Sequence, residues 1–418
     1  MNQDFDVIVV GAGIAGATTA ATAASLGSNV LILEEHSRVG IPSHCSGHVG
    51  INGMKRLVAS LPDTMIKNQI RGAVFHSPSG KLLRVERQNP ITWVLDRKAF
   101  DDHMTTQAEK AGAQIEYNSR AVSVQATSNE PVQVRIAAGD KLRAVSCGLV
   151  VDCEGAAPAL IPNRPASERR RSMWVNSAQV HVDRVNGLDL DFVEVYLGSK
   201  YAPGFFAWII PWRDGSAKVG LAARDGNPRL LLEKFMTRHP EASQKLKGTK
   251  QRDMSFHPMP LGGPISGTYC PGMLIVGDSA QQVKPTTGGG IVFSLICGKA
   301  AGRTAHEAIT SRDVSDSFLS KYERRWKNEI GYDLKVMRAV RRMLFRLPDR
   351  QMERIFSVAR TFDVDAVLSR ADDIDTQGRT LARLAFDPRL AISLLYSSVL
   401  SLPYSAISGD AGVRRSGT

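Results

Sequence analysis

Three glycines near the start of the sequence have a spacing that suits phosphate chemistry. Gly11, Gly13 and Gly16 form the pattern G-x-G-x-x-G directly after an apolar run. In such a turn the first glycine bends the chain, the second lets a pyrophosphate approach the backbone, and the third lets a helix pack closely on a strand. Glu34 ends the next apolar run, where a carboxylate can accept hydrogen bonds from a ribose diol. The combination predicts a dinucleotide-binding site.

A second carboxylate stands before a run of three glycines much later in the chain. Asp278 follows an apolar run and Gly277, and Gly288–Gly290 then open a long stretch of helix-forming residues. Asp278 can hold ribityl hydroxyls, and the glycines let a flat ring lie against the backbone. The helix N-terminus can stabilise negative charge on that ring, such as a reduced flavin carries. An ordinary strand–helix turn needs neither the acid nor three consecutive glycines.

A loop with one cysteine follows Glu34. The glycines and the proline between residues 39 and 48 predict an irregular segment. Because it leaves the end of a parallel strand, we expect it to lie over the nucleotide crevice. Cys45 is therefore a candidate active-site thiol, and a small apolar filler is an equally good interpretation. His44 and His48 are expected to be solvated or structural rather than catalytic.

The elements that must position these residues alternate at first and become mostly β later. The pattern predicts strands at 6–10 and 30–33 with a helix at 17–26 between them, short strands through 71–96, a helix from 98 to about 111, further strands to 136, and a buried strand that ends in Glu154-Gly155. Residues 173–258 are predicted to be mostly β with a helix near 229–238. The chain from about 311 is predicted to be helical.

Composition excludes some classes of protein. With 418 residues, 43% hydrophobic and 22% charged, the chain suits a soluble globular protein. The first strand begins so near Met1 that no signal peptide is expected, and no apolar run is long enough to span a bilayer. Five scattered cysteines without C-x-x-C indicate a reducing compartment and no zinc site. A net charge of +12 suits an anionic partner such as nucleic acid, anionic lipid or a phosphorylated substrate.

Two further stretches suggest contact with apolar molecules. The aromatic cluster Phe205, Phe206 and Trp208 is either a core strand or the wall of an apolar substrate channel. Residues 332–347 form a two-faced pattern, with Val336, Met337, Val340, Met343, Leu344 and Leu347 on one stripe and Lys335, Arg338, Arg341, Arg342 and Arg346 on the other. Such a helix can lie on an anionic membrane, or its apolar stripe can pack on the protein. Leu390–Leu402 is a weaker membrane candidate.

Taken in order, these segments resemble the flavoprotein hydroxylases and reductases of the para-hydroxybenzoate hydroxylase type. Pro42-x-x-Cys45-x-Gly47 is similar to the proline–cysteine–glycine motif of the geranylgeranyl reductases, and Phe206-x-Trp208-x-Ile210-Pro211 resembles their aromatic motif. Four positions depart from the pattern. Ser46 stands where the family usually has glycine, Phe206 replaces tyrosine, Ile210 replaces phenylalanine, and Glu154 replaces aspartate.

The resemblance implies an α/β (α+β) fold: a Rossmann-type FAD-binding domain with an inserted antiparallel β-sheet substrate domain and a C-terminal helical region. The expected boundaries are 1–70, 96–165 and 270–310 for the FAD-binding domain, 71–95 and 166–269 for the substrate domain, and 311–418 for the helical region.

The resemblance also implies roles for single residues. The backbone near Gly11, Gly13, Ala15 and Gly16 would hold the pyrophosphate, Glu34 the adenosine ribose, Arg97 the phosphate or ribityl part, and Val122 the adenine. Cys45, Ser46 and Gly47 would lie by the flavin ring, which Asp278, Gly289, Gly290 and Ile291 would hold from the other side. Phe206 and Trp208 would contact substrate, and Cys45 is the candidate proton donor or gate.

The implied activity is FAD-dependent reduction of isoprenoid double bonds in a membrane lipid. The expected substrates are archaeal ether phospholipids, and the prenyl tails of quinones or chlorophyll precursors are the alternatives. An aromatic hydroxylase using NADPH and oxygen is the alternative enzyme, and a non-catalytic prenyl-binding escort protein is the alternative class. The electron donor, ferredoxin or NAD(P)H, stays open. We expect a monomer on the cytoplasmic face of the membrane that binds neither metal nor nucleic acid.

Overall fold

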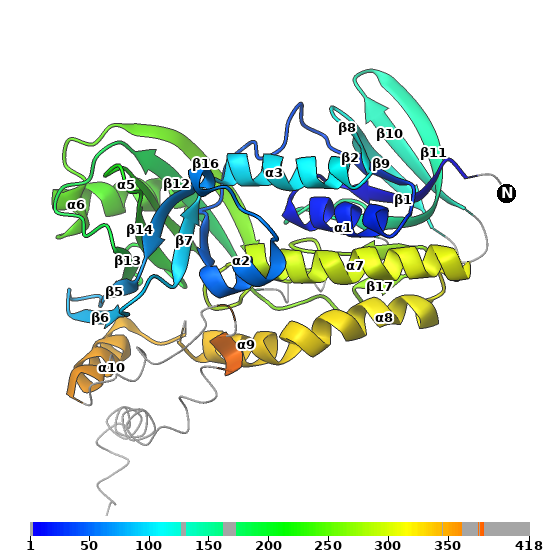
Figure 1. Cartoon of the computed structure of the whole chain (residues 1–418). Coiled ribbons are helices and arrows are strands. Elements are labelled where there is room, and N and C mark those ends of the chain that lie inside the picture. Colours follow the sequence, from blue (N-terminus) through cyan, green and yellow to red (C-terminus); the bar gives the residue numbers. More distant parts are fainter. Residues whose placement is uncertain are drawn as a thin grey trace, which may run out of the picture.

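The computed structural model describes residues 3–126, 131–161, 173–344, 346–361, 375 and 377–379. Figure 1 shows a helix-rich region that contains the N-terminus next to a second region dominated by a large sheet, with C-terminal helices running below both. The predicted mixed α/β architecture is confirmed. The predicted membrane candidate Leu390–Leu402 lies outside the described residues.

The first large sheet is the core of the N-terminal region. Its strand order is β17-β18-β11-β1-β2-β8, and β9 and β10 extend β11 as an antiparallel ribbon. The strands are β1 (Phe5–Val10), β2 (Val30–Leu33), β8 (Gln114–Glu116), β9 (Arg120–Gln125), β10 (Val132–Ala138), β11 (Lys141–Asp152), β17 (Tyr269–Cys270) and β18 (Met273–Ile275). β1 pairs in parallel with β2 and β11, as buried central strands usually do in doubly wound sheets.

Side chains alternate between the two faces of this sheet. Val7 and Val9 join the cluster formed with helices α1 (Ile14–Ser25), α3 (Arg97–Lys110) and α7 (Ile291–Ser311). Ile8 and Val10 point to the opposite face and pack with β9 and β10. The apolar run of β1 is continuous because both faces are covered.

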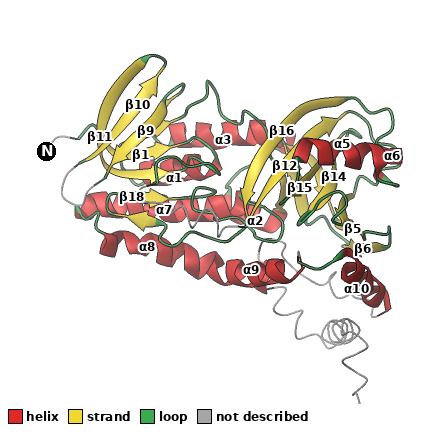
Figure 2. Ribbon diagram, turned by 180° about the vertical axis from the view of Figure 1, so that it is seen from behind, coloured by secondary structure: helices red, strands yellow, loops and turns green. Residues whose placement is uncertain are grey.

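The second sheet has seven strands in the order β16-β12-β15-β14-β13-β5-β6. They are β5 (Gly72–His76), β6 (Leu82–Glu86), β12 (Trp174–Val182), β13 (Phe192–Leu197), β14 (Phe206–Pro211), β15 (Ala217–Ala223) and β16 (Gln251–Pro260). All neighbours are antiparallel except β5 and β13. Helices α5 (Pro228–Arg238) and α6 (Ala242–Lys245) cover one face (Figure 2), so the other face is left for a site.

A small third sheet joins the two regions. It contains β3 (His48–Gly50), β7 (Thr92–Leu95) and β4 (Ile66–Ile70), with α2 (Ile51–Leu57) and the short helix η1 (Asp63–Met65) between β3 and β4. β7, which the expected boundaries assigned to the substrate domain, therefore pairs here and not in the seven-stranded sheet with β5 and β6. Asn68 of β4 donates from Nδ2 to the carbonyl oxygens of Leu190 (2.7 Å) and Pro211 (3.0 Å), which fastens the small sheet to the large one.

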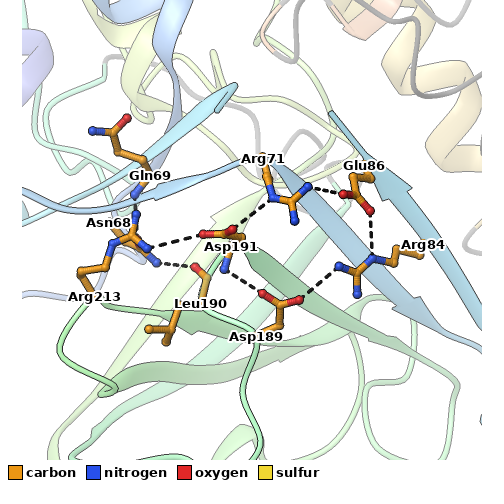
Figure 3. Close-up of polar contacts among 9 residues, drawn as sticks. All are labelled: Asn68, Gln69, Arg71, Arg84, Glu86, Asp189, Leu190, Asp191 and Arg213. Carbon is orange, nitrogen blue, oxygen red and sulfur yellow. Dashed lines mark hydrogen bonds and ion pairs between the residues drawn. The ribbon is translucent and has the colours of Figure 1, made fainter. Parts of the chain in front are cut away.

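A chain of ion pairs aligns the β5–β6 hairpin with the turn before β13 (Figure 3). Arg71 Nε lies 3.1 Å from Asp191 Oδ2, and Arg71 also pairs with Glu86. Arg84 bridges Glu86 and Asp189, with 3.1 Å between its guanidinium and Asp189 Oδ2. Exposed pairs stabilise little individually, so the network mainly fixes how the hairpin sits on the sheet.

The C-terminal helices are α8 (Asp316–Trp326), the π-helical turn η2 (Lys327–Gly331), α9 (Tyr332–Leu344) and α10 (Asp349–Thr361). The predicted faces of α9 are wrong at two positions. Arg341, expected with the basic residues, is buried at 2% exposure, donates to Gly204 O at 3.4 Å and lies over the Phe205 ring. Met343, expected on the apolar stripe, is 50% exposed.

The docking of α9 explains both errors. Leu334 and Met337 are buried and set the side of the helix that faces the protein. Arg341 follows one turn after Met337 on that same side, where a carbonyl and an aromatic ring receive its guanidinium. Lys335, Arg338 and Arg342 remain exposed. Among the described helices none is long and apolar enough to cross a membrane.

Candidate active site

One cavity of about 1000 Å³ connects the two large sheets. At one end it is lined by the glycine turn and by Glu34, at the other by apolar side chains of the seven-stranded sheet, and in the middle by the Cys45 loop and the Gly288–Gly290 run. The site therefore joins a polar compartment suited to a nucleotide to an apolar compartment.

The glycine turn has the geometry that its spacing predicts. Gly11 has φ +95°, and a Cβ there would lie 2.5 Å from Cys153 O. A Cβ on Gly16 would lie 1.8 Å from Gly11 O, which shows how closely α1 packs on the turn. A Cβ on Gly13 would meet no atom within 4 Å, because Gly13 faces the cavity. Gly13 is also the N-cap of α1 and has no side-chain cap, so the helix N-terminus is open to an anion.

Glu34 is buried at the end of β2 and holds the turn from the other side. Its Oε2 accepts from Ala12 N at 2.9 Å, and its Oε1 accepts from His36 N at 3.0 Å. The carboxylate lines the cavity beside the turn, which places it where a ribose next to a pyrophosphate would lie. The glycine turn and Glu34 fit a dinucleotide because the backbone at Gly13 is open to a pyrophosphate and the Glu34 carboxylate lies beside it.

The second glycine run opens α7 toward the same cavity. Asp278, Gly289, Gly290 and Ile291 all line the cavity. Gly290 is the N-cap of α7 and carries no side-chain cap, and a Cβ on it would lie 3.3 Å from Asp278 Oδ1. The backbone and the carboxylate together leave room for a flat ring, and the helix N-terminus favours negative charge on it.

Two buried cations hold the Cys45 loop. Lys218 of β15 donates from Nζ to Cys45 O at 2.5 Å, and burial lowers the pKa of Lys218. Arg97 makes two hydrogen bonds to Asp101, of 3.0 and 2.9 Å, and it interacts electrostatically with Cys45. Burial alone lowers the pKa of Arg97, but Asp101 and Cys45 outweigh it and raise the pKa. Arg97 lines the cavity, and much of its hydrogen-bonding capacity is directed to Asp101.

Alternate residues of β14 form the apolar end of the cavity. Phe206, Trp208 and Ile210 line it together with Phe75 of β5, which lies two strands away in the same sheet. Trp208 Nε1 donates to Gln179 Oε1 at 3.2 Å, so the N–H of this partly buried indole has a partner. A Cβ on Gly220 would lie 2.6 Å from the Trp208 ring, so this glycine makes room for the indole.

Three predicted cofactor contacts do not line the cavity. Gly16 is packed behind the turn, and Gly47, with φ +78°, backs onto the Leu95 carbonyl. The Val122 side chain is 44% exposed, and its neighbour Ala121 lines the cavity instead. Val122 was expected near the adenine, but successive strand residues face opposite sides, so its side chain points away.

The structure adds residues that sequence reasoning missed. His257 of β16 lines the cavity, stacks on His44 with ring centroids 3.8 Å apart, and places Nε2 3.5 Å from Asp278 Oδ2. Burial, followed by His257 and Arg97, lowers the pKa of His44 to about 3. His48 is also in the cavity wall, where burial lowers its pKa to about 4. No local pattern around His257 marks it, because β16 is far from the Cys45 loop in the sequence.

The fold and the site define an FAD-dependent oxidoreductase with an apolar substrate compartment. The sequence profile described as "FAD binding domain" matches residues 4–295. The chain is 32% identical to digeranylgeranylglycerophospholipid reductase 2 of Methanothermobacter thermautotrophicus, over 87% of this chain and 94% of that protein. It is 30% identical to digeranylgeranylglycerophospholipid reductase of Methanocaldococcus jannaschii, over 84% of this chain and 90% of that protein.

A solved structure has the same fold. The geranylgeranyl bacteriochlorophyll reductase-like protein of Thermoplasma acidophilum superposes with a TM-score of 0.80 and 24% identity, covering 95% of this chain and 99% of that one. From these matches the chain belongs to the digeranylgeranylglycerophospholipid reductase family of FAD-binding proteins.

Proposed function

We propose that the protein is a reductase that uses FAD to saturate isoprenoid double bonds in the geranylgeranyl chains of a membrane phospholipid. The observation that carries this proposal is the continuity of the cavity from the glycine turn to the apolar face of β14. A polyisoprenoid chain fits a compartment lined by Phe75, Phe206, Trp208 and Ile210. The names of the relatives support the same lipid class.

The residues of the chain supply binding, exclusion of water and electrostatics. Reduced FAD, when bound, supplies a hydride. The open N-terminus of α7 at Gly290 favours the negative charge of the reduced cofactor. The apolar side chains of β14 exclude water from the double bond, which is a poor electrophile and needs a dry, well-oriented site.

The exposed face of α9 is our candidate for contact with the membrane. Lys335, Arg338 and Arg342 are exposed there, and Tyr332 and Met343 are about half exposed. Basic residues near an anionic bilayer contribute about 1 kcal/mol each, and exposed apolar side chains can enter the interface. We therefore propose peripheral binding at the cytoplasmic face of the membrane, which also gives the net charge of +12 a role without nucleic acid.

We further propose that the protein acts as a monomer and that ferredoxin or NAD(P)H reduces it. Dithionite replaces either donor in a first experiment. The FAD-loaded protein is reduced without oxygen and mixed with vesicles that contain geranylgeranyl phospholipid, and the lipid is analysed by mass spectrometry. We expect the gain of one H₂ for each double bond saturated, and a much smaller gain with Trp208→Ala.

The same experiment separates the competing enzyme class. A hydroxylase would leave the lipid unchanged and would couple oxygen consumption to an aromatic substrate. A protein that purifies without FAD would support the escort class. Unchanged lipid with fully reduced, FAD-loaded protein would contradict the proposed reductase.

A further inference from the structure

Two histidines from distant parts of the chain meet inside the cavity. The rings of His44, in the Cys45 loop, and His257, on β16, lie 3.8 Å apart and within 7° of parallel. His257 Nε2 lies 3.5 Å from Asp278 Oδ2, and all three residues line the cavity. Cofactor binding and the apolar wall leave this pair of rings without a role, whereas saturation of a double bond needs a proton as well as a hydride.

The surroundings of the two rings differ. Burial, then His257 and Arg97, lower the pKa of His44 to about 3, so His44 is neutral at neutral pH. The Asp278 carboxylate lies beside His257, with Oδ2 3.5 Å from the ring Nε2. On β12, the Ser177 hydroxyl bonds to the backbone carbonyl of His257 at 2.9 Å, so it does not occupy the ring. His257 therefore lies between a carboxylate and a ring that is neutral at neutral pH.

We propose that His257, as an imidazolium, donates the proton to the isoprenoid double bond, and that His44 and Asp278 position it. The inference rests on the proposed reductase function. As the π bond breaks, one carbon accepts a hydride and its electron pair from reduced FAD, which becomes oxidised. The other carbon takes the proton from a ring N–H of His257, whose bonding electrons remain on nitrogen. Water at the cavity mouth returns the proton.

General chemistry favours this donor over the thiol of Cys45. An ordinary imidazolium is a stronger acid than an ordinary thiol by about two pK units, and the better acid transfers a proton more readily to a weak base. Cys45 then keeps a role beside the ring system, where Arg97 and Lys218 fix its loop.

The test compares His257→Gln with a matched histidine outside the cavity. His181 lies on β12 of the same sheet, with its ring edge-on to Trp212 at 4.6 Å, and it does not line the cavity. In a single turnover with dithionite-reduced protein and geranylgeranyl phospholipid vesicles, His257→Gln should be slower by about 10²- to 10⁴-fold, the usual contribution of a general acid. FAD affinity should stay within a few-fold, and His181→Gln should match the wild type.

Two readouts separate proton donation from a structural role. The wild-type rate should fall as rising pH deprotonates His257, whereas His257→Gln should show no such limb. Ring NMR of the FAD-loaded protein without substrate should show proton uptake on His257 and not on His44.

The outcomes distinguish this inference from the proposed function. If the wild type saturates lipid and His257→Gln has the same rate and pH profile, the inference is overturned and the reductase function stands. If the wild type saturates no lipid, the proposed function fails. The NMR titration then decides the charge assignment, and proton uptake on His44 in place of His257 overturns it.

Discussion

Gly13→Ala tests whether the glycine turn holds a pyrophosphate or is only a turn. The added Cβ meets no protein atom within 4 Å and points into the cavity. Gly13 has φ −63°, a conformation that alanine adopts freely. The fold therefore has no steric reason to change, and the N-cap substitution should cost less than about 1 kcal/mol.

The main effect of Gly13→Ala should be weaker binding of FAD. If the methyl group displaces the pyrophosphate from one backbone N–H, it removes a charge-assisted hydrogen bond of about 1.5–3 kcal/mol. Since about 1.4 kcal/mol corresponds to a factor of ten, FAD affinity should fall by about 10- to 100-fold. Fluorescence titration of the FAD-free protein measures the affinity, and thermal unfolding of the same sample measures the stability without the contribution of bound ligand.

Gly16→Ala is the matched comparison. Its Cβ would lie 1.8 Å from Gly11 O, whereas real Cβ contacts are essentially never under 3.0 Å, so backbone must move by more than an ångström. Overpacking costs about 1–3 kcal/mol, and the upper end applies because backbone is less compliant than a side chain. The better helix propensity of alanine returns about 1 kcal/mol. The net loss of about 2 kcal/mol should lower the Tm of the FAD-free protein by about 2 °C, because the unfolding entropy of a chain of 418 residues is large. If the Gly13→Ala variant binds FAD as tightly as the wild type does, the placement of the pyrophosphate at this turn is refuted.

Three further results are expected. Cys45→Ser should retain FAD yet saturate lipid much more slowly in the single-turnover assay, and an unchanged rate would make Cys45 a packing residue. The double variant Arg338→Glu with Arg342→Glu should weaken binding to anionic liposomes at low salt by about 4 kcal/mol, counting about 1 kcal/mol for each basic residue removed and each acid added. Flotation measures this binding, and unchanged flotation would exclude this face of α9. The pKa of His48 is about 4 when folded against 6.5 for an ordinary histidine, so the unfolded chain binds more protons between these values. Wild-type stability in urea should therefore fall as pH drops from 6.5 to 4, and His48→Gln should remove that part of the loss.

The sequence by itself determined the nucleotide end of the site. Gly11, Gly13 and Gly16 are consecutive members of one turn, so their roles follow from local backbone geometry and short-range packing. The same holds for the glycines that open α7, because an uncapped helix N-terminus is a property of a continuous segment. Phe206 and Trp208 are alternate residues of one strand, so local strand geometry alone puts them on the same face.

Only the tertiary structure decided which distant residues complete the site. His257 reaches His44 and Asp278 because β16 lies at one edge of the seven-stranded sheet and the Cys45 loop crosses from the first sheet, a relation that no local period encodes. Lys218 of β15 reaches Cys45 O because the Cys45 loop crosses to the seven-stranded sheet. A helical period places Arg341 on a stripe, but whether that stripe is buried depends on a carbonyl and a ring elsewhere that stabilise its charge. The docking of the sheets and helices determines which distant residues meet, whereas sequence spacing determines only which side chains share a face of one element.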